Sequence, residues 1–277
     1  MQENVKIITN TKISKNYFKI ILRYNNIPTL TQPGQFIEMR VSDSYEPLLR
    51  RPFSIHKVNG SDIEILYEVV GRGTEILSRR KPGEYLDVIG PLGNGFTYQA
   101  TSHKPQATVL VAGGMGVAPL IFLAEKLADI KTQNPKLKTL VLIGAETKDE
   151  ILCEREFKAL DCNVKISTDD GSAGFKGKVT DLLRKILATN HKPQATNKMF
   201  AACSLQPAAV IYACGPKPML EEISRISCKH NIRAQVSLEE HMACGIGICF
   251  GCAVKTKYGY KRVCKEGPVF NADEIIW

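Results

Sequence analysis

Residues 108–119 read Thr-Val-Leu-Val-Ala-Gly-Gly-Met-Gly-Val-Ala-Pro. The first five residues form a continuous run without charged side chains, which is typical of a strand buried on both faces of a parallel sheet. A glycine-rich turn follows, and we expect a helix over about residues 118–130. A strand, a tight turn and a helix in this order predict the beginning of a doubly wound α/β domain.

The alternation of strand and helix continues beyond this stretch. Further strands are predicted at 137–144, 163–168 and 209–214, with helices near 150–160, 179–189 and 217–230. Residues 189–206 are polar and irregular, and we interpret them as a surface insertion without an assigned role. The central part of the chain therefore fits one α/β domain with a parallel sheet.

Residues 1 to about 100 have a different pattern. Short β-branched and aromatic runs are separated by turns such as Gln32-Pro33-Gly34, with one short helix expected at about 74–80. This pattern predicts a small antiparallel β-barrel. We therefore expect an α+β multidomain protein, with a barrel over 1–102, a doubly wound α/β domain over 103–235 and a cysteine-rich segment over 236–277.

Composition excludes several classes of protein. No run of about 18 apolar residues predicts a membrane span, and the N-terminus lacks the apolar core of a signal peptide. Nine cysteines, an odd number, do not predict a secreted disulfide framework, so we expect a reducing, cytoplasmic location. The net charge of +9 is scattered rather than clustered. Nucleic-acid binding is therefore not expected, because no groove-reading motif accompanies the charge.

Four cysteines near the C-terminus have the spacing C-x4-C-x2-C-x11-C: Cys244, Cys249, Cys252 and Cys264. This is the spacing of plant-type [2Fe–2S] ferredoxins. Intervening glycines allow backbone N–H groups to approach the sulfur atoms. A four-cysteine zinc site is the alternative, although structural zinc favours separated pairs of cysteines. The spacing predicts that these four residues hold a [2Fe–2S] cluster.

Two turns of the α/β domain could approach a phosphate. One turn contains Gly113, Gly114 and Gly116, between the first strand and the first helix. The other contains Cys214, Gly215 and Pro216, after the last apolar strand. Ligands of open α/β sheets bind beyond the carboxyl ends of the strands, where both turns are expected. Together they predict a dinucleotide crevice, although tight turns need glycine in any case and Cys214 is as readily a buried structural thiol.

The barrel carries a second candidate site. Arg51, Pro52, Phe53 and Ser54 place a cation, an aromatic ring and a hydroxyl on one extended segment. A flavin dinucleotide could use all three, with the guanidinium on its pyrophosphate. Gly73 and Thr74, at the beginning of the short helix, would supply a second anion-binding element. Without this context the segment is an ordinary polar-edged strand.

These motifs resemble a known superfamily. Arg-Pro-Phe-Ser, Gly-x-Gly-Thr, Gly-Gly-x-Gly-x-x-Pro and Cys-Gly-Pro-x-Pro-Met occur in the order seen in the ferredoxin–NADP reductase superfamily. The cysteine-rich segment, with Tyr-Lys-Arg-Val-Cys-Lys-Glu-Gly-Pro-Val-Phe at 260–270, closely resembles the electron-transfer subunits of dihydroorotate dehydrogenase B. The stretches at 169–172 and 176–180 are similar to those subunits too. The resemblance covers nearly the whole chain.

The resemblance implies three cofactors and a partner. It implies FAD in the barrel, NAD in the α/β domain and a [2Fe–2S] cluster in the cysteine-rich segment. FAD would be lined by residues 51–54, held by Gly73 and Thr74, and flanked on its other side by Leu66, Tyr67 and Glu68. The partner would be an FMN-containing catalytic subunit that oxidises dihydroorotate, as a heterotetramer, with electrons running through the cluster and FAD to NAD+. No catalytic side chain is assigned to this chain.

Two rival interpretations of the function of this chain stay open. The chain could be a ferredoxin–NAD(P) reductase-like subunit of a flavin-based transhydrogenase or sulfide dehydrogenase, or a zinc-binding module without redox turnover.

Glu146 follows the second α/β strand, near the expected adenosine ribose. A carboxylate there accepts hydrogen bonds from a free 2′-hydroxyl and repels a 2′-phosphate. Glu146 therefore favours NAD(H), unless it is a solvated loop residue or Lys148 offsets its charge.

Overall fold

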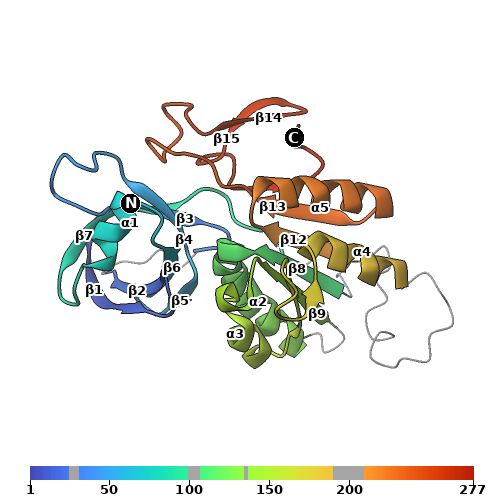
Figure 1. Ribbon diagram of the computed structural model, residues 1–277. Coiled ribbons are helices and arrows are strands. Elements are labelled where there is room, and N and C mark those ends of the chain that lie inside the picture. Colours follow the sequence, from blue (N-terminus) through green and yellow to red (C-terminus); the bar gives the residue numbers. More distant parts are fainter. Residues whose placement is uncertain (25–30, 99–106, 134–136, 190–208) are drawn as a thin grey trace. The chain divides into compact units, whose positions relative to one another are not determined.

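The computed structural model describes residues 1–24, 31–98, 107–133, 137–189 and 209–277 (Figure 1). The chain divides into two compact units. The first contains residues 1–96, 239–269 and 276, and the second contains 97–238, 270–275 and 277. Nearly all of the insertion expected at 189–206, and the boundary expected at residue 102, lie outside the described residues. The three-part division into 1–102, 103–235 and 236–277 stays a prediction.

An antiparallel half-barrel forms the first unit. Its strand order is β4-β3-β7-β1-β2-β6-β5. The elements are β1 (Gln2–Lys12), β2 (Tyr17–Arg23), β3 (Phe36–Arg40), β4 (Arg51–Ser54), β5 (Lys57–Asn59), β6 (Asp62–Glu68), α1 (Arg72–Ser78) and β7 (Tyr85–Leu92). β-Branched residues alternate inward along the strands, and Ile7, Ile20 and Ile65 are fully buried. The antiparallel barrel predicted from the sequence is confirmed.

The cysteine-rich segment packs on this half-barrel. It contains the hairpin β14 (Ala253–Thr256) and β15 (Gly259–Arg262), which sequence analysis did not predict. Asn94, just after β7, connects the two parts, because its backbone N–H donates to the Gly267 carbonyl at 2.6 Å and its side-chain amide donates to the Glu266 carbonyl at 3.0 Å. The segment is thus part of the first unit.

The second unit is a doubly wound α/β fold, as predicted. Its sheet has the order β11-β10-β9-β8-β12-β13-β16, and the strands from β8 to β13 pair in parallel. The strands are β8 (Ala107–Gly113), β9 (Lys138–Ala145), β10 (Asn163–Thr168), β11 (Phe175–Lys176), β12 (Ala209–Cys214), β13 (Arg233–Ser237) and β16 (Val269–Asn271). The helices are α2 (Val117–Gln133), α3 (Glu154–Ala159), α4 (Val179–Thr189) and α5 (Lys217–His230), with short 3₁₀ turns η1 (Gly114–Gly116) and η2 (Lys148–Glu150).

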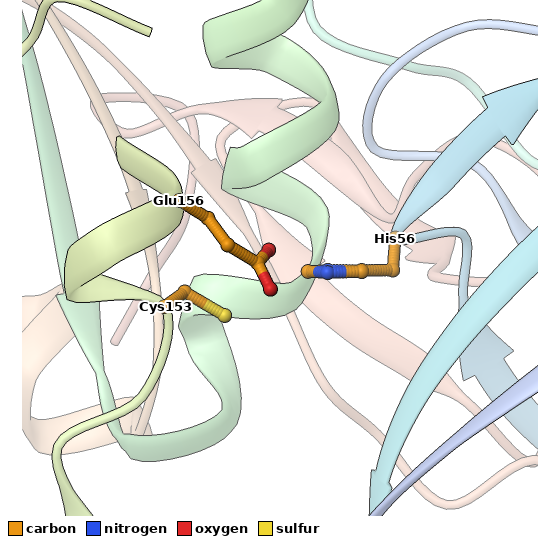
Figure 2. A group of neighbouring side chains, drawn as sticks. All are labelled: His56, Cys153 and Glu156. Carbon is orange, nitrogen blue, oxygen red and sulfur yellow. The ribbon is translucent and has the colours of Figure 1, made fainter. Parts of the chain in front are cut away.

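One predicted helix is shorter than expected. The sequence predicts a helix near 150–160, whereas α3 begins only at Glu154. Cys153, immediately before it, has a left-handed φ of 60° that a helix cannot continue through. Cys153 and Glu156 both lie on this part of the second unit (Figure 2). His56, the third residue that Figure 2 labels, follows β4 in the first unit and is buried.

No helix in the described part of the chain is long and apolar enough to cross a membrane.

Candidate functional site

The loop that contains three of the four predicted cluster cysteines depends on two glycines. Gly245 and Gly247 are buried and have φ of +67° and +84°, in the left-handed region that favours glycine. A Cβ at Gly245 would lie 2.3 Å from Cγ of Glu38, and one at Gly247 would lie 2.6 Å from Cδ of Lys265. A larger residue at Gly245 would push the loop away from the half-barrel.

Backbone N–H groups of this loop point at the sulfur atoms. The N–H groups of Ile248 and Cys249 donate to Cys244 Sγ at 3.4 and 3.5 Å, and that of Gly251 donates to Cys249 Sγ at 3.4 Å. The N–H of Cys264 donates to Cys252 Sγ at 3.4 Å. Donors of this kind stabilise thiolates and the negative charge of an iron–sulfur cluster. The loop therefore fits the expected cluster.

The four thiols differ in environment. Burial alone would raise the pKa of Cys244, but the loop N–H groups outweigh it and lower that pKa to about 6. Burial and the neighbouring Cys252 raise the pKa of Cys264 to about 12. Cys252 and Cys264 are buried whereas Cys249 is exposed. Of the four predicted ligands, two thus lie in the interior of the unit, and Cys249 lies at its surface.

Glu38 lies beneath the cluster loop, and sequence analysis missed it. This residue of β3 is fully buried, and neither of its carboxylate oxygens has a hydrogen-bond partner. Burial raises the pKa of Glu38 to about 7, although the charges of Arg50 and Arg51 oppose the shift. A buried carboxyl without partners is costly. The only sequence signal was an acidic residue inside an otherwise apolar run.

The flavin candidate residues converge at the beginning of α1. The Arg51 side chain lies against Gly73, where an added Cβ would be 2.7 Å from Nε of Arg51. The Thr74 hydroxyl accepts from the N–H of Val70 at 3.0 Å and donates to the Gly71 carbonyl at 3.1 Å, which fixes the turn. A guanidinium that lies against a glycine at a helix start fits an anionic pyrophosphate.

The remaining barrel candidates lie on both faces of their strands. Arg51 and Phe53 share one face of β4, whereas Pro52 and Ser54 share the other. Phe53 packs edge-on against Tyr67, with ring centroids 5.8 Å apart. The Tyr67 hydroxyl donates to Asn10 Oδ1 at 2.9 Å. β4 is an edge strand of the sheet, so a ligand at that edge could reach side chains of both faces.

Three further flavin candidates lie on β6, where Leu66 and Tyr67 are buried while Glu68 is half-buried. The structure therefore places all nine barrel candidates on β4, β6 and α1 of one unit.

The two glycine turns of the second unit contact each other. A Cβ at Gly116 would lie 1.9 Å from the Cys214 carbonyl oxygen, and one at Gly113 would lie 2.9 Å from Cδ of Pro216. Gly114, with φ of +52°, has nothing within 4 Å of its Cβ position. The turns thus pack at the carboxyl ends of β8 and β12 and leave open space over Gly114. This arrangement fits the close approach of a dinucleotide phosphate.

A second carboxylate lies near Glu146. Glu146 is exposed after β9, and its carbonyl accepts from the N–H of Asp170 at 3.3 Å. Ser172 connects the two loops, because its hydroxyl accepts from the N–H of Lys148 at 2.8 Å and donates to Asp170 at 2.6 Å. Those hydrogen bonds from Ser172 lower the pKa of Asp170. The negative charge near this edge is therefore larger than Glu146 alone supplies.

The cysteines outside the quartet lie apart from the cluster loop in the sequence, and none of the eight described cysteines forms a disulfide. Cys162 is half-buried and Cys228 is exposed on α5, whereas Cys203 lies outside the described residues. Burial raises the pKa of Cys162 to about 11, so this thiol stays protonated at neutral pH.

The fold is that of ferredoxin reductases. The chain is similar to a solved NADH-dependent reduced ferredoxin–NADP oxidoreductase, studied for flavin-based electron bifurcation, with a TM-score of 0.79 and 26% identity over 99% of this chain and 90% of that one. It also shares the fold of a ferredoxin NADP+ reductase from Neisseria gonorrhoeae, with a TM-score of 0.63 and 14% identity over 83% and 91% of the two chains. Half-barrel and α/β unit together define a flavin-reductase type of oxidoreductase.

Comparison with known sequences identifies the family of the chain more specifically than the fold does. The family model of the iron–sulfur cluster binding domain of dihydroorotate dehydrogenase B matches residues 239–276, and that of the oxidoreductase NAD-binding domain matches 110–225. Proteins named dihydroorotate dehydrogenase B (NAD(+)), electron transfer subunit, are 38% identical in Desulforamulus reducens and 36% identical in Fusobacterium nucleatum, each over 99% of this chain and 98% of its own length. The chain belongs to this family of electron transfer subunits, which confirms the resemblance inferred from the motifs.

Proposed function

We propose that the chain carries electrons between an FMN-containing dihydroorotate dehydrogenase subunit and NAD+, in pyrimidine biosynthesis. The observation that carries this proposal is the 244–252 loop, which places thiols under backbone N–H groups in the same compact unit as the Arg51–Gly73 pair. A one-electron centre and a flavin site within one unit are what such a carrier needs. The names of the full-length relatives support the same role.

Each proposed cofactor has a set of residues. We propose that Cys244, Cys249, Cys252 and Cys264 hold the [2Fe–2S] cluster. FAD is held by Arg51, Pro52, Phe53, Ser54, Leu66, Tyr67, Glu68, Gly73 and Thr74. NAD is held by Gly113, Gly114, Gly116, Glu146, Cys214, Gly215 and Pro216. When bound, the flavin exchanges hydride with nicotinamide and also exchanges single electrons with the cluster, which converts two-electron into one-electron transfer.

The side chains of this protein bind and position the cofactors rather than break bonds. The guanidinium of Arg51 balances pyrophosphate charge, and the Thr74 hydroxyl keeps the turn in shape. The loop N–H groups lower the cost of thiolate charge. Oxidation of dihydroorotate belongs to the partner subunit, with which we propose a heterotetramer. Because thiols in this number persist in a reducing compartment, we propose the cytoplasm as its location.

The decisive experiment is anaerobic co-purification with an FMN-containing, dihydroorotate-oxidising subunit of the same organism. We expect a complex that contains FAD, iron and acid-labile sulfide and that reduces NAD+ when dihydroorotate is added. The matched control is Cys249→Ser, which should keep the partner and FAD but lose NAD+ reduction by dihydroorotate. A wild-type chain with zinc in place of iron and sulfide would refute the proposal.

One observation favours a rival partner. The structural similarity to an NADH-dependent reduced ferredoxin–NADP oxidoreductase covers 99% of this chain. A subunit of that type would co-purify with a large second flavoprotein instead. Capture of such a flavoprotein, with no dihydroorotate-dependent NADH formation, would replace the first proposal by this one.

A further inference from the structure

Arg262, at the end of β15, contacts the cluster loop at two residues, Gly247 and Phe250, and is paired with Glu266. Its Nη1 donates to the Gly247 carbonyl at 2.6 Å. Its Nε donates to Glu266 at 3.0 Å, and its guanidinium carbon lies 4.7 Å from the centre of the Phe250 ring. The side chain is only 19% exposed, so the charge is held in place.

The contact with Gly247 reaches a sulfur ligand through one peptide group. The carbonyl of Gly247 and the N–H of Ile248 belong to the same peptide unit, and that N–H donates to Cys244 Sγ at 3.4 Å. A cation on the carbonyl polarises the peptide and strengthens its N–H as a donor. The effect of Arg262 on Cys244 is therefore transmitted through a fixed, planar group.

Arg262 also acts on the other ligand pair. Arg262 lies two residues before Cys264 in the sequence and pairs across the hairpin with Ala253, the residue after Cys252. Glu266 forms an ion pair with this guanidinium, accepting from both Nε and Nη2 of Arg262. Of the two charges in the pair, the cation is the one that contacts the cluster loop, at the Gly247 carbonyl and the Phe250 ring.

We propose that Arg262 is a positioning residue that raises the reduction potential of the cluster, by its own charge and by polarising the Gly247–Ile248 peptide. This inference rests on the proposed [2Fe–2S] cluster. One electron enters the cluster on reduction and no bond forms or breaks, so the added negative charge is stabilised by a nearby cation and by stronger N–H donors. Glu266 partly neutralises the cation and sets its orientation.

The test is an EPR-monitored redox titration of the purified holoprotein. Arg262→Gln should lower the ratio of reduced to oxidised cluster about tenfold at a fixed potential, which corresponds to about 59 mV for a one-electron couple. Glu266→Gln should shift the ratio in the opposite direction, because it removes the neutralising carboxylate. The matched control is Lys261→Gln, which removes one positive charge from the neighbouring residue, whose ammonium lies 5.5 Å from the Tyr258 ring, and should change the ratio less than twofold.

Iron and acid-labile sulfide per chain are measured on every sample. An Arg262→Gln shift no larger than that of Lys261→Gln, or a shift to higher potential, would overturn the inference. If Arg262→Gln binds no iron, Glu266→Gln decides alone, and an unchanged or lower potential there overturns it. Absence of iron and sulfide from the wild-type protein would instead refute the proposed function.

Discussion

Glu38→Gln should stabilise the protein above neutral pH and leave its stability near pH 4.5 unchanged. Glu38 is fully buried in β3 against Gly245, with no hydrogen-bond partner for either oxygen. Burial raises its pKa from 4.5 to about 7 in the folded protein. Glutamine has nearly the same shape and no ionised form, so the variant removes only the cost of the buried charge.

The sign and size of the effect follow from proton linkage. Between pH 4.5 and 7 the folded state binds more protons at Glu38 than the unfolded state, so the free energy of unfolding falls as pH rises. The stability associated with this carboxyl is complete below pH 4.5 and is lost as pH rises through 7. At about 1.4 kcal/mol for each pH unit, the difference between the two pKa values corresponds to about 3 kcal/mol.

The assay is guanidinium unfolding at a series of pH values from 5 to 8.5, under anaerobic conditions, followed by circular dichroism. The stability of Glu38→Gln minus that of the wild type should grow with pH and level off above pH 7. Asp43→Asn, which replaces an exposed carboxylate in the loop after β3, is the control and should show no such trend. Parallel curves for Glu38→Gln and wild type would refute the reasoning.

Three further predictions concern the proposed sites. Cys249→Ser should lose or weaken the cluster because thiolates are its protein anchors, whereas the exposed Cys228→Ser should keep full iron and sulfide per chain; the opposite pattern would contradict the ligand assignment. Arg51→Ala should lose FAD on dialysis, because a charge-assisted hydrogen bond contributes about 1.5–3 kcal/mol, and complete retention of FAD would count against the barrel site. In diaphorase turnover, kcat/KM should favour NADH over NADPH at least about tenfold, or about 1.4 kcal/mol, and less in Glu146→Arg; equal use of both by the wild type would disprove the preference.

The parallel sheet could be predicted because a strand that is buried on both faces is apolar along its whole length. All seven residues of β8 are buried, and the corresponding stretch is apolar without alternation. The glycine turn after it could be predicted for a steric reason, since the Cys214 carbonyl leaves no room for a side chain at Gly116. The prediction of α3 was less accurate. Residues 148–153 form a 3₁₀ turn and end in a left-handed residue instead of forming a helical turn.

The spacing of the four cysteines predicts them as cluster ligands, but it does not predict their surroundings. Glu38 lies in an apolar run, where strand alternation would place its side chain on the solvent face. That face is covered by Gly245, a residue far away in the sequence, so only the folded chain shows that the carboxyl is buried. Arg262 likewise resembles any cation of a polar hairpin until its contacts with Gly247 and Phe250 are known.

The contacts of the cysteine-rich segment indicate why it belongs with the half-barrel rather than standing alone. Its own regular structure is one short hairpin, which would be marginal in water by itself. Gly245 packs on Glu38, and Asn94 binds the Gly267 and Glu266 carbonyls, so the half-barrel fixes both sides of the ligand set. Rigid support of this kind keeps the N–H groups directed at the sulfur atoms when the charge of a cluster changes. Residues that never contact iron would then influence how easily the protein accepts an electron.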